Sequence, residues 1–107
     1  MSGSFGEMGN LLKQAQKMQQ EIDRVREELR TQSVDGTSPD GQVKVEVCGD
    51  RSVKSISISP ELAGTGDAAR IEAAIMAALA TATERADALR EQRLSKVTGG
   101  MNLPGLL

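Results

Sequence analysis

Five cationic side chains lie near the two ends of this sequence, and binding to phosphate is the chemistry they could perform. They are Lys13, Lys17, Arg90, Arg93 and Lys96. Residues 1–20 carry a net charge of +1 and residues 88–107 carry +2, whereas residues 21–87 carry −5, against −2 for the whole chain. Each phosphate that such a cation neutralises releases a counterion, which favours binding to a polyanion. The charge pattern therefore predicts positive ends and an acidic middle.

The spacing of these cations along a helix leaves them short of acidic neighbours. Lys13 and Lys17 are four residues apart, so they repel each other on one helix face. Arg93 has Leu89, not an acid, four residues before it. Unpaired like charges favour an external anionic partner, and double-stranded DNA contacted through its phosphates fits best. The alternative is an ordinary solvated face, which is what most charge runs are.

The residues needed for catalysis or metal binding are scarce. The chain has no His, Trp or Tyr, so Cys48 has no imidazole to activate it as a nucleophile. A zinc site would need more Cys or His ligands than the sequence contains. The segment GTGDAA at 64–69 has the spacing of a dinucleotide-binding loop, but Asp67 would place a carboxylate where a pyrophosphate must bind. We therefore expect no enzyme, no cofactor, no metal and no small-molecule substrate.

The composition indicates one domain in a reducing compartment. The chain has 107 residues, Phe5 is its only aromatic residue, and Cys48 is its only cysteine. The remaining apolar residues bury little area each, so an oligomer is expected. A lone cysteine forms no intramolecular disulfide. No secretory signal or membrane-spanning run is visible, so we expect a cytoplasmic protein that does not insert into a membrane.

A regular apolar row predicts a long helix over residues 7–32, after a Gly/Ser-rich segment at 1–6 that is expected to be flexible. The row, here named the apolar seam, consists of Met8, Leu11, Ala15, Met18, Ile22, Val25 and Leu29. Its steps alternate between three and four residues, as in a coiled coil. The seam is expected to pack against a second helix or a second copy of the chain. The alternative is an ordinary amphipathic helix on a monomeric sheet.

Alternating residues predict antiparallel strands within 33–59. The segment QVKVEVC alternates strictly, and SVKSISIS follows after Gly-Asp at 49–50, a plausible two-residue hairpin loop. Residues expected on the face that packs within the chain or pairs with a second copy are Val43, Val45, Val47, Ile56 and Ile58. Val53 has the opposite parity to the two isoleucines, which a β-bulge would absorb. A third strand at 33–37 is a weaker expectation.

A second long helix is predicted over residues 67–98. Asp67 is a suitable N-cap, no Gly or Pro follows until Gly99, and residues 99–107 form a short apolar tail. At 1.5 Å per residue this second helix spans roughly 45 Å and the first helix roughly 35–40 Å, too long for a few strands to cover. If they run back to back, the start of the first meets the end of the second. The expected fold class is α+β, with a long helix, a two- to three-stranded antiparallel sheet and a long helix in an elongated, tweezer-like homodimer.

Three segments together carry a family resemblance that covers nearly the whole chain. MGNLLKQAQKMQQEI, GQVKVEVCGDRSVKSISISPEL and RLSKVTGGMNLPGL resemble, in order and spacing, the YbaB/EbfC family of bacterial nucleoid-associated proteins. The resemblance implies a tweezer-shaped homodimer in the cytoplasm and nucleoid that binds duplex DNA and influences nucleoid organisation or gene expression. It also hints at a link to recombinational-repair or replication proteins. The alternative function is an adaptor that docks a partner protein without contacting DNA.

Overall fold

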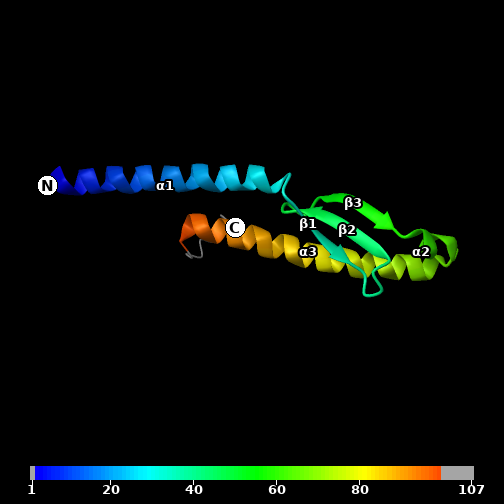
Figure 1. The fold of residues 1–107 in the computed structure, drawn as a ribbon. Coiled ribbons are helices and arrows are strands. Elements are labelled where there is room, and N and C mark those ends of the chain that lie inside the picture. Colours follow the sequence, from blue (N-terminus) through cyan, green and yellow to red (C-terminus); the bar gives the residue numbers. More distant parts are fainter. Residues whose placement is uncertain (1, 100–107) are drawn as a thin grey trace.

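The computed structural model describes residues 2–99, with side chains from residue 6 onward, and it shows an elongated α+β fold (Figure 1). The molecule measures 77 × 20 × 16 Å and its radius of gyration is 20.5 Å, whereas a compact domain of this size has about 13 Å. The elements are α1 (Ser2–Leu29), β1 (Ser33–Thr37), β2 (Val43–Cys48), β3 (Val53–Ile58), α2 (Pro60–Gly64) and α3 (Ala68–Thr98). The predicted α+β class, with a long helix before and after an antiparallel sheet, is confirmed for the single chain.

The first helix differs from its predicted bounds at both ends. It begins at Ser2, so the segment that was expected to be flexible is helical from its second residue. A Gly in a helix costs only about 1 kcal/mol, and extending an existing helix needs no new nucleus. The helix ends at Leu29 and not at residue 32, because the N–H groups of Arg30 and Thr31 donate to carbonyls three residues back, those of Glu27 and Glu28, and so tighten the last turn. Ser33 then begins β1 by pairing with Cys48.

The three strands form one antiparallel sheet in the order β1-β2-β3. The weaker strand predicted at 33–37 is present as β1. The hairpin between β2 and β3 has four residues, 49–52, instead of the predicted two. The loop is longer because Arg51 takes the left-handed position, with φ of 74°, and Asp50 accepts a hydrogen bond from the Ser52 N–H at 3.0 Å. The expected bulge is confirmed, since Glu46 pairs with Ser55 and Val47 pairs with Val53.

The main core lies where α3 crosses under β1 and β2. Val43, Val45 and Val47 are fully buried, as predicted, against a row of small residues on α3. That row is Ala78, Ala82 and Ala86. Leu62, from the short helix α2 that the sequence analysis treated as a connector, closes the far end of this core. Small residues on both sides allow the helix and the sheet to approach closely.

A second core joins the two long helices beyond the sheet. Ile22, Val25 and Leu29 of α1 are buried against Leu94 of α3, with Met18, Leu89 and Val97 packed around them. The end of α3 therefore lies beside the middle of α1, and α1 continues past it (Figure 1). This corrects the expectation that the start of the first helix meets the end of the second. We name the part of α1 that continues past α3, residues 2–17, the free arm.

The edge strand β3 is less covered than the sequence suggested. Ile56 and Ile58 were expected on the packed face, and they do lie on the same side of the sheet as Val45 and Val43, their pairing partners. They nevertheless remain 49% and 38% exposed. They are exposed because α3 packs mainly under β1 and β2 and leaves β3 at the side uncovered. Within one chain these two isoleucines are therefore only partly covered, and their role in a seam between two copies stays a prediction.

We predict that Gly36→Ala destabilises the fold, because Gly36 on β1 faces α3 with no room for a side chain. An added Cβ would lie 2.9 Å from Ala82 Cα and closer still to the backbone of Ala78 and Ala82. Overpacking of this kind costs about 1–3 kcal/mol in the free energy of unfolding, which urea denaturation would measure.

The matched control is Gly9→Ala, because nothing lies within 4 Å of the added Cβ at this helical position. It should stabilise the protein by up to about 1 kcal/mol, since Ala favours the helix over Gly. Equal unfolding free energies for Gly36→Ala and the wild type would contradict the close packing of α3 on β1.

Candidate nucleic-acid interface

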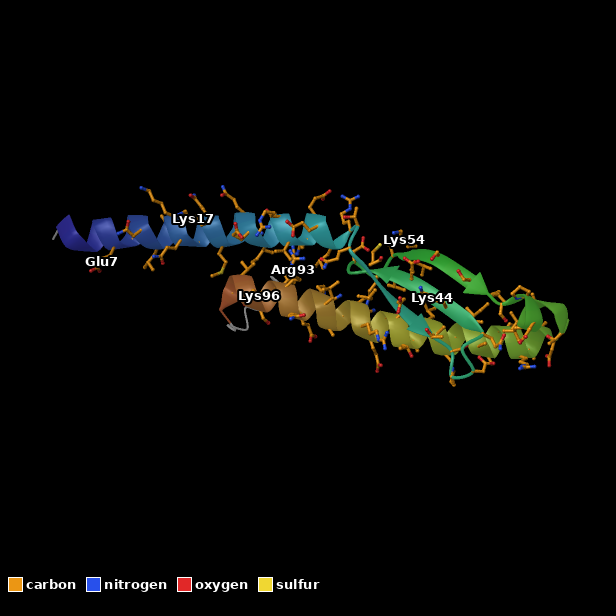
Figure 2. The ribbon with its side chains drawn as sticks, viewed as in Figure 1. Glu7, Lys17, Lys44, Lys54, Arg93 and Lys96 are labelled. Carbon is orange, nitrogen blue, oxygen red and sulfur yellow. The ribbon has the colours of Figure 1, made fainter. Side chains whose placement is uncertain are left out.

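Two of the five predicted phosphate-binding residues project from the free arm. Lys13 and Lys17 are both exposed, and each lies two residues from a seam position, Leu11 or Ala15. Two residues correspond to about 200° around a helix. The two lysines therefore share one face of α1, on the side opposite the seam. Figure 2 shows Lys17 on the stretch of α1 that continues past α3.

Lys96 supplies a third exposed cation, on the last turn of α3. Its charge is favourably placed, because the carboxyl end of a helix carries a partial negative charge. Within residues 6–99, none of Lys13, Lys17 and Lys96 forms an ion pair. These three lysines are therefore available to an external anion.

The lysines of the sheet differ from those of the helices in being paired. Lys44 lies 3.6 Å from Asp35, and Lys54 lies 4.0 Å from Glu46. All four side chains belong to the sheet, and Figure 2 shows Lys44 and Lys54 far from the free arm. The unpaired lysines thus gather at the helical end of the molecule and the paired ones on the sheet. This separation agrees with the charge distribution of the sequence.

Arg93, the fourth predicted residue, points between the two long helices. Its guanidinium donates to the Glu28 carboxylate and, at 2.5 Å, to the side-chain oxygen of Gln32. Local spacing on the same helix offers Arg93 no acid, because Leu89 lies four residues before it. Its acid is 65 residues earlier in the chain. The hydrogen bond from Arg93 is the main cause that lowers the pKa of Glu28, and bonds from Arg24 act in the same direction.

Arg90, the fifth predicted residue, is also engaged within the chain. It lies 3.2 Å from Asp87, three residues before it. Arg51 of the β2–β3 loop donates two hydrogen bonds, of 2.8 and 2.6 Å, to the same carboxylate. The Arg51 hydrogen bonds are the main cause that lowers the pKa of Asp87. Arg90 and Arg93 are therefore engaged in contacts within the chain, whereas Lys13, Lys17 and Lys96 have no ion pair among residues 6–99.

Sequence reasoning missed the acids that hold these arginines. The Asp87–Arg90 pair follows an ordinary i,i+3 spacing and could have been found from the sequence. The Glu28–Arg93 and Arg51–Asp87 pairs join distant segments, and no local pattern indicates them. Among residues 2–99, no three side chains are grouped as metal ligands. In the same range, no helix is apolar enough over a sufficient length to cross a bilayer.

The geometry defines a class of protein: an elongated α+β fold in which a sheet packs on one long helix and a second long helix carries exposed lysines past the body. The model of the YbaB/EbfC DNA-binding family matches residues 5–101. The chain belongs to this family, as the sequence resemblance predicted.

Relatives and a solved structure agree with this assignment. Nucleoid-associated protein TTE0040 of Caldanaerobacter subterraneus is 39% identical over 104 residues, which cover 97% of this chain and 93% of the relative. A nucleoid-associated protein of Acetivibrio thermocellus is 39% identical over 105 residues, with the same coverage. The crystal structure of the uncharacterized protein HP0035 from Helicobacter pylori matches with a TM-score of 0.69 at 21% identity. It covers 89% of this chain and 97% of that one, and it shows the same fold.

We predict that the Glu28–Arg93 pair makes stability depend on pH in the acid range. The folded-state pKa of Glu28 is lowered, so its contribution is present above the ordinary glutamate pKa of about 4.3 and is lost as the pH falls through the lowered value. When the pH is lowered from about 7 to about 3, the free energy of unfolding of the Glu28→Gln variant should therefore fall less than that of the wild type. Urea denaturation at both pH values would measure this difference.

The matched control is Glu7→Gln, because Glu7 is exposed near the end of the free arm, far from Arg93 (Figure 2). This variant should lose as much stability on acidification as the wild type. If Glu28→Gln behaves in the same way as Glu7→Gln, the Glu28–Arg93 pair does not contribute to folding.

Proposed function

We propose that this protein binds double-stranded DNA as a homodimer in the bacterial cytoplasm and nucleoid, where it organises DNA and influences gene expression. The observation that supports this most is the pair of exposed, unpaired lysines on an arm that projects past the body. Membership of the YbaB/EbfC DNA-binding family and the names of the nucleoid-associated relatives support the same function. That family is not an enzyme family.

In this proposal the contact with DNA is electrostatic and made to the backbone. Lys13, Lys17 and Lys96 neutralise phosphates, which fixes the position of the protein but reads no sequence. Arg93 serves mainly by joining α3 to α1, and Arg90 pairs with Asp87 within α3, so both reach phosphate only if their ion pairs open. The acidic remainder of the chain turns the sheet away from the polyanion and orients the approach.

The surface proposed for dimerisation is the uncovered apolar side of β3. Val53, Ile56 and Ile58 are all exposed there, along an edge strand whose outer backbone groups have no partner strand among residues 2–99. An exposed edge of this kind is a template for another chain. A second copy that covers it would bury three β-branched side chains.

The neighbouring flank of α3 extends this apolar surface. Asp87 bonds to Arg51 beside β3, so the flank of α3 that carries Asp87 faces the β3 side of the sheet. Met76 lies three helical turns before Asp87 on that same flank, and it is 65% exposed. The combined surface, here named the open edge, is formed by Val53, Ile56, Ile58 and Met76. A group of exposed apolar side chains of this kind is typical of a surface that binds another chain.

A dimer joined through the open edge would carry two free arms and twice the number of unpaired lysines. Two arms that engage one duplex bind more tightly than either alone, because the second contact is intramolecular. A link of this dimer to recombinational-repair or replication proteins remains a proposal that rests on the family resemblance.

We predict that the double variant Lys13→Ala/Lys17→Ala weakens DNA binding for all duplex sequences. The slope of log affinity against log salt should become shallower by about one unit for each phosphate that the variant no longer neutralises. A gel-shift or anisotropy titration between ~50 and ~200 mM salt would measure both effects. The matched control is Lys44→Ala/Lys54→Ala, which removes the same charge from the sheet and should change affinity and slope much less.

Two results would argue against this function. Equal decreases in affinity for both double variants would mean that net charge matters and that the arm does not. Absence of any salt-dependent DNA binding by the wild-type protein would favour the alternative function, an adaptor that binds another protein without contacting DNA.

We predict that Ile56→Asp shifts the protein from dimer to monomer, because it buries a charge in the proposed interface. Light scattering coupled to size-exclusion chromatography would measure the mass. Ser57→Asp is the matched control, since it lies on the opposite face of β3 and pairs with Lys44. It should remain dimeric. A dimeric Ile56→Asp protein would place the interface elsewhere.

A further inference from the structure

The half of the apolar seam that lies on the free arm has no covering in the described part of the chain. Met8 and Leu11 are 60% and 64% exposed, and Ala15 is exposed as well. The other half, Ile22 to Leu29, is buried against α3. The row of apolar side chains thus continues unchanged past the point where its partner helix ends. An uncovered continuation of a packed seam indicates that something else lies on it.

The end of α3 lies at the edge of this uncovered half. Val97 packs in the same cluster as Met18, so the last turn of α3 sits at the boundary between the covered and uncovered parts of the seam. The helix runs toward the amino-terminal end of α1 (Figure 1). Gly99 ends it in the left-handed conformation, with φ of 66° and its N–H bonded to the Ser95 carbonyl. This cap turns the chain out of the helix beside α1.

The residues that follow have a matching composition and a sufficient length. Residues 100–107 read GMNLPGLL, with no charged side chain. We propose that this segment docks on the seam of its own free arm and covers Met8, Leu11 and Ala15. The seam from Met18 to Met8 rises about 15 Å along the helix axis, whereas eight extended residues reach about 26 Å. The segment is therefore long enough to follow the seam to its end.

The chain's own tail fits this surface better than a separate partner does. It is tethered at the edge of the surface, so its effective concentration there is in the millimolar range without any binding partner. Pro104 disfavours a helix in this segment, and a residue that precedes Pro favours extended backbone. An extended segment presents a narrow row of side chains, which suits a seam that is one row wide. The docked tail would leave Lys13 and Lys17, on the opposite face, free.

Disulfide trapping tests this placement. In a Cys48→Ser background, the variant Leu11→Cys/Leu103→Cys would be oxidised mildly with copper phenanthroline, and the products would be separated on a non-reducing gel and mapped by mass spectrometry. A disulfide requires Cα atoms within about 7 Å of each other. We expect a bond within one chain, formed about tenfold more readily than in Lys13→Cys/Leu103→Cys, whose first cysteine lies on the opposite face of the arm. Circular dichroism would show that both variants are folded.

Each other outcome overturns the proposal. A bond between two chains would place a second copy on the seam instead of the chain's own tail. Equal trapping in the two variants would mean that the tail does not choose a face of the arm. The absence of trapping in Leu11→Cys/Leu103→Cys would mean that the tail does not reach the seam. None of these results depends on whether the protein binds DNA.

Discussion

The packing of Ile22, Val25 and Leu29 on Leu94 holds the two long helices together where the sheet can no longer support them. The strands are only five or six residues long, whereas α1 and α3 contain 28 and 31 residues. Beyond the sheet, among residues 2–99, the two helices pack against each other. Arg93 and Glu28 fix the helices at the same place with an ion pair. Because an isolated helix in water is only marginally stable, the position of the lysines on the free arm depends on this small cluster.

The second constraint is the use of small residues where α3 meets the sheet. Gly36 faces Ala78 and Ala82, so the helix lies very close to β1 and β2. A close approach buries the valines of β2 fully, but one narrow helix cannot also cover β3. The apolar side of the edge strand is left open as a consequence. The same packing that stabilises the single chain thus creates the surface we assign to a second copy.

Local patterns in the sequence predicted the features that depend on local physics. The alternation of Val43, Val45 and Val47, the Asp67 cap and the bulge before Val53 were all found in the structure. Features that depend on how distant elements are placed could not be predicted in this way. The partner of Arg93 requires the register between α1 and α3, and the exposure of Ile56 requires the lateral position of α3. The five candidate cations depend on the same placement. Local sequence therefore could not distinguish the three lysines that lack an ion pair among residues 6–99 from the two arginines that form one.

Two helices too long for a single small body extend from the sheet, and we propose that this sheet pairs with a second copy. Small-angle X-ray scattering of the purified protein, with the mass taken from absolute intensity, tests this claim most directly. The account predicts the mass of two chains and a radius of gyration above the 20.5 Å of one chain. A particle with the mass of one chain and a radius of gyration of about 13 Å, as expected for a compact domain of this length, would contradict it.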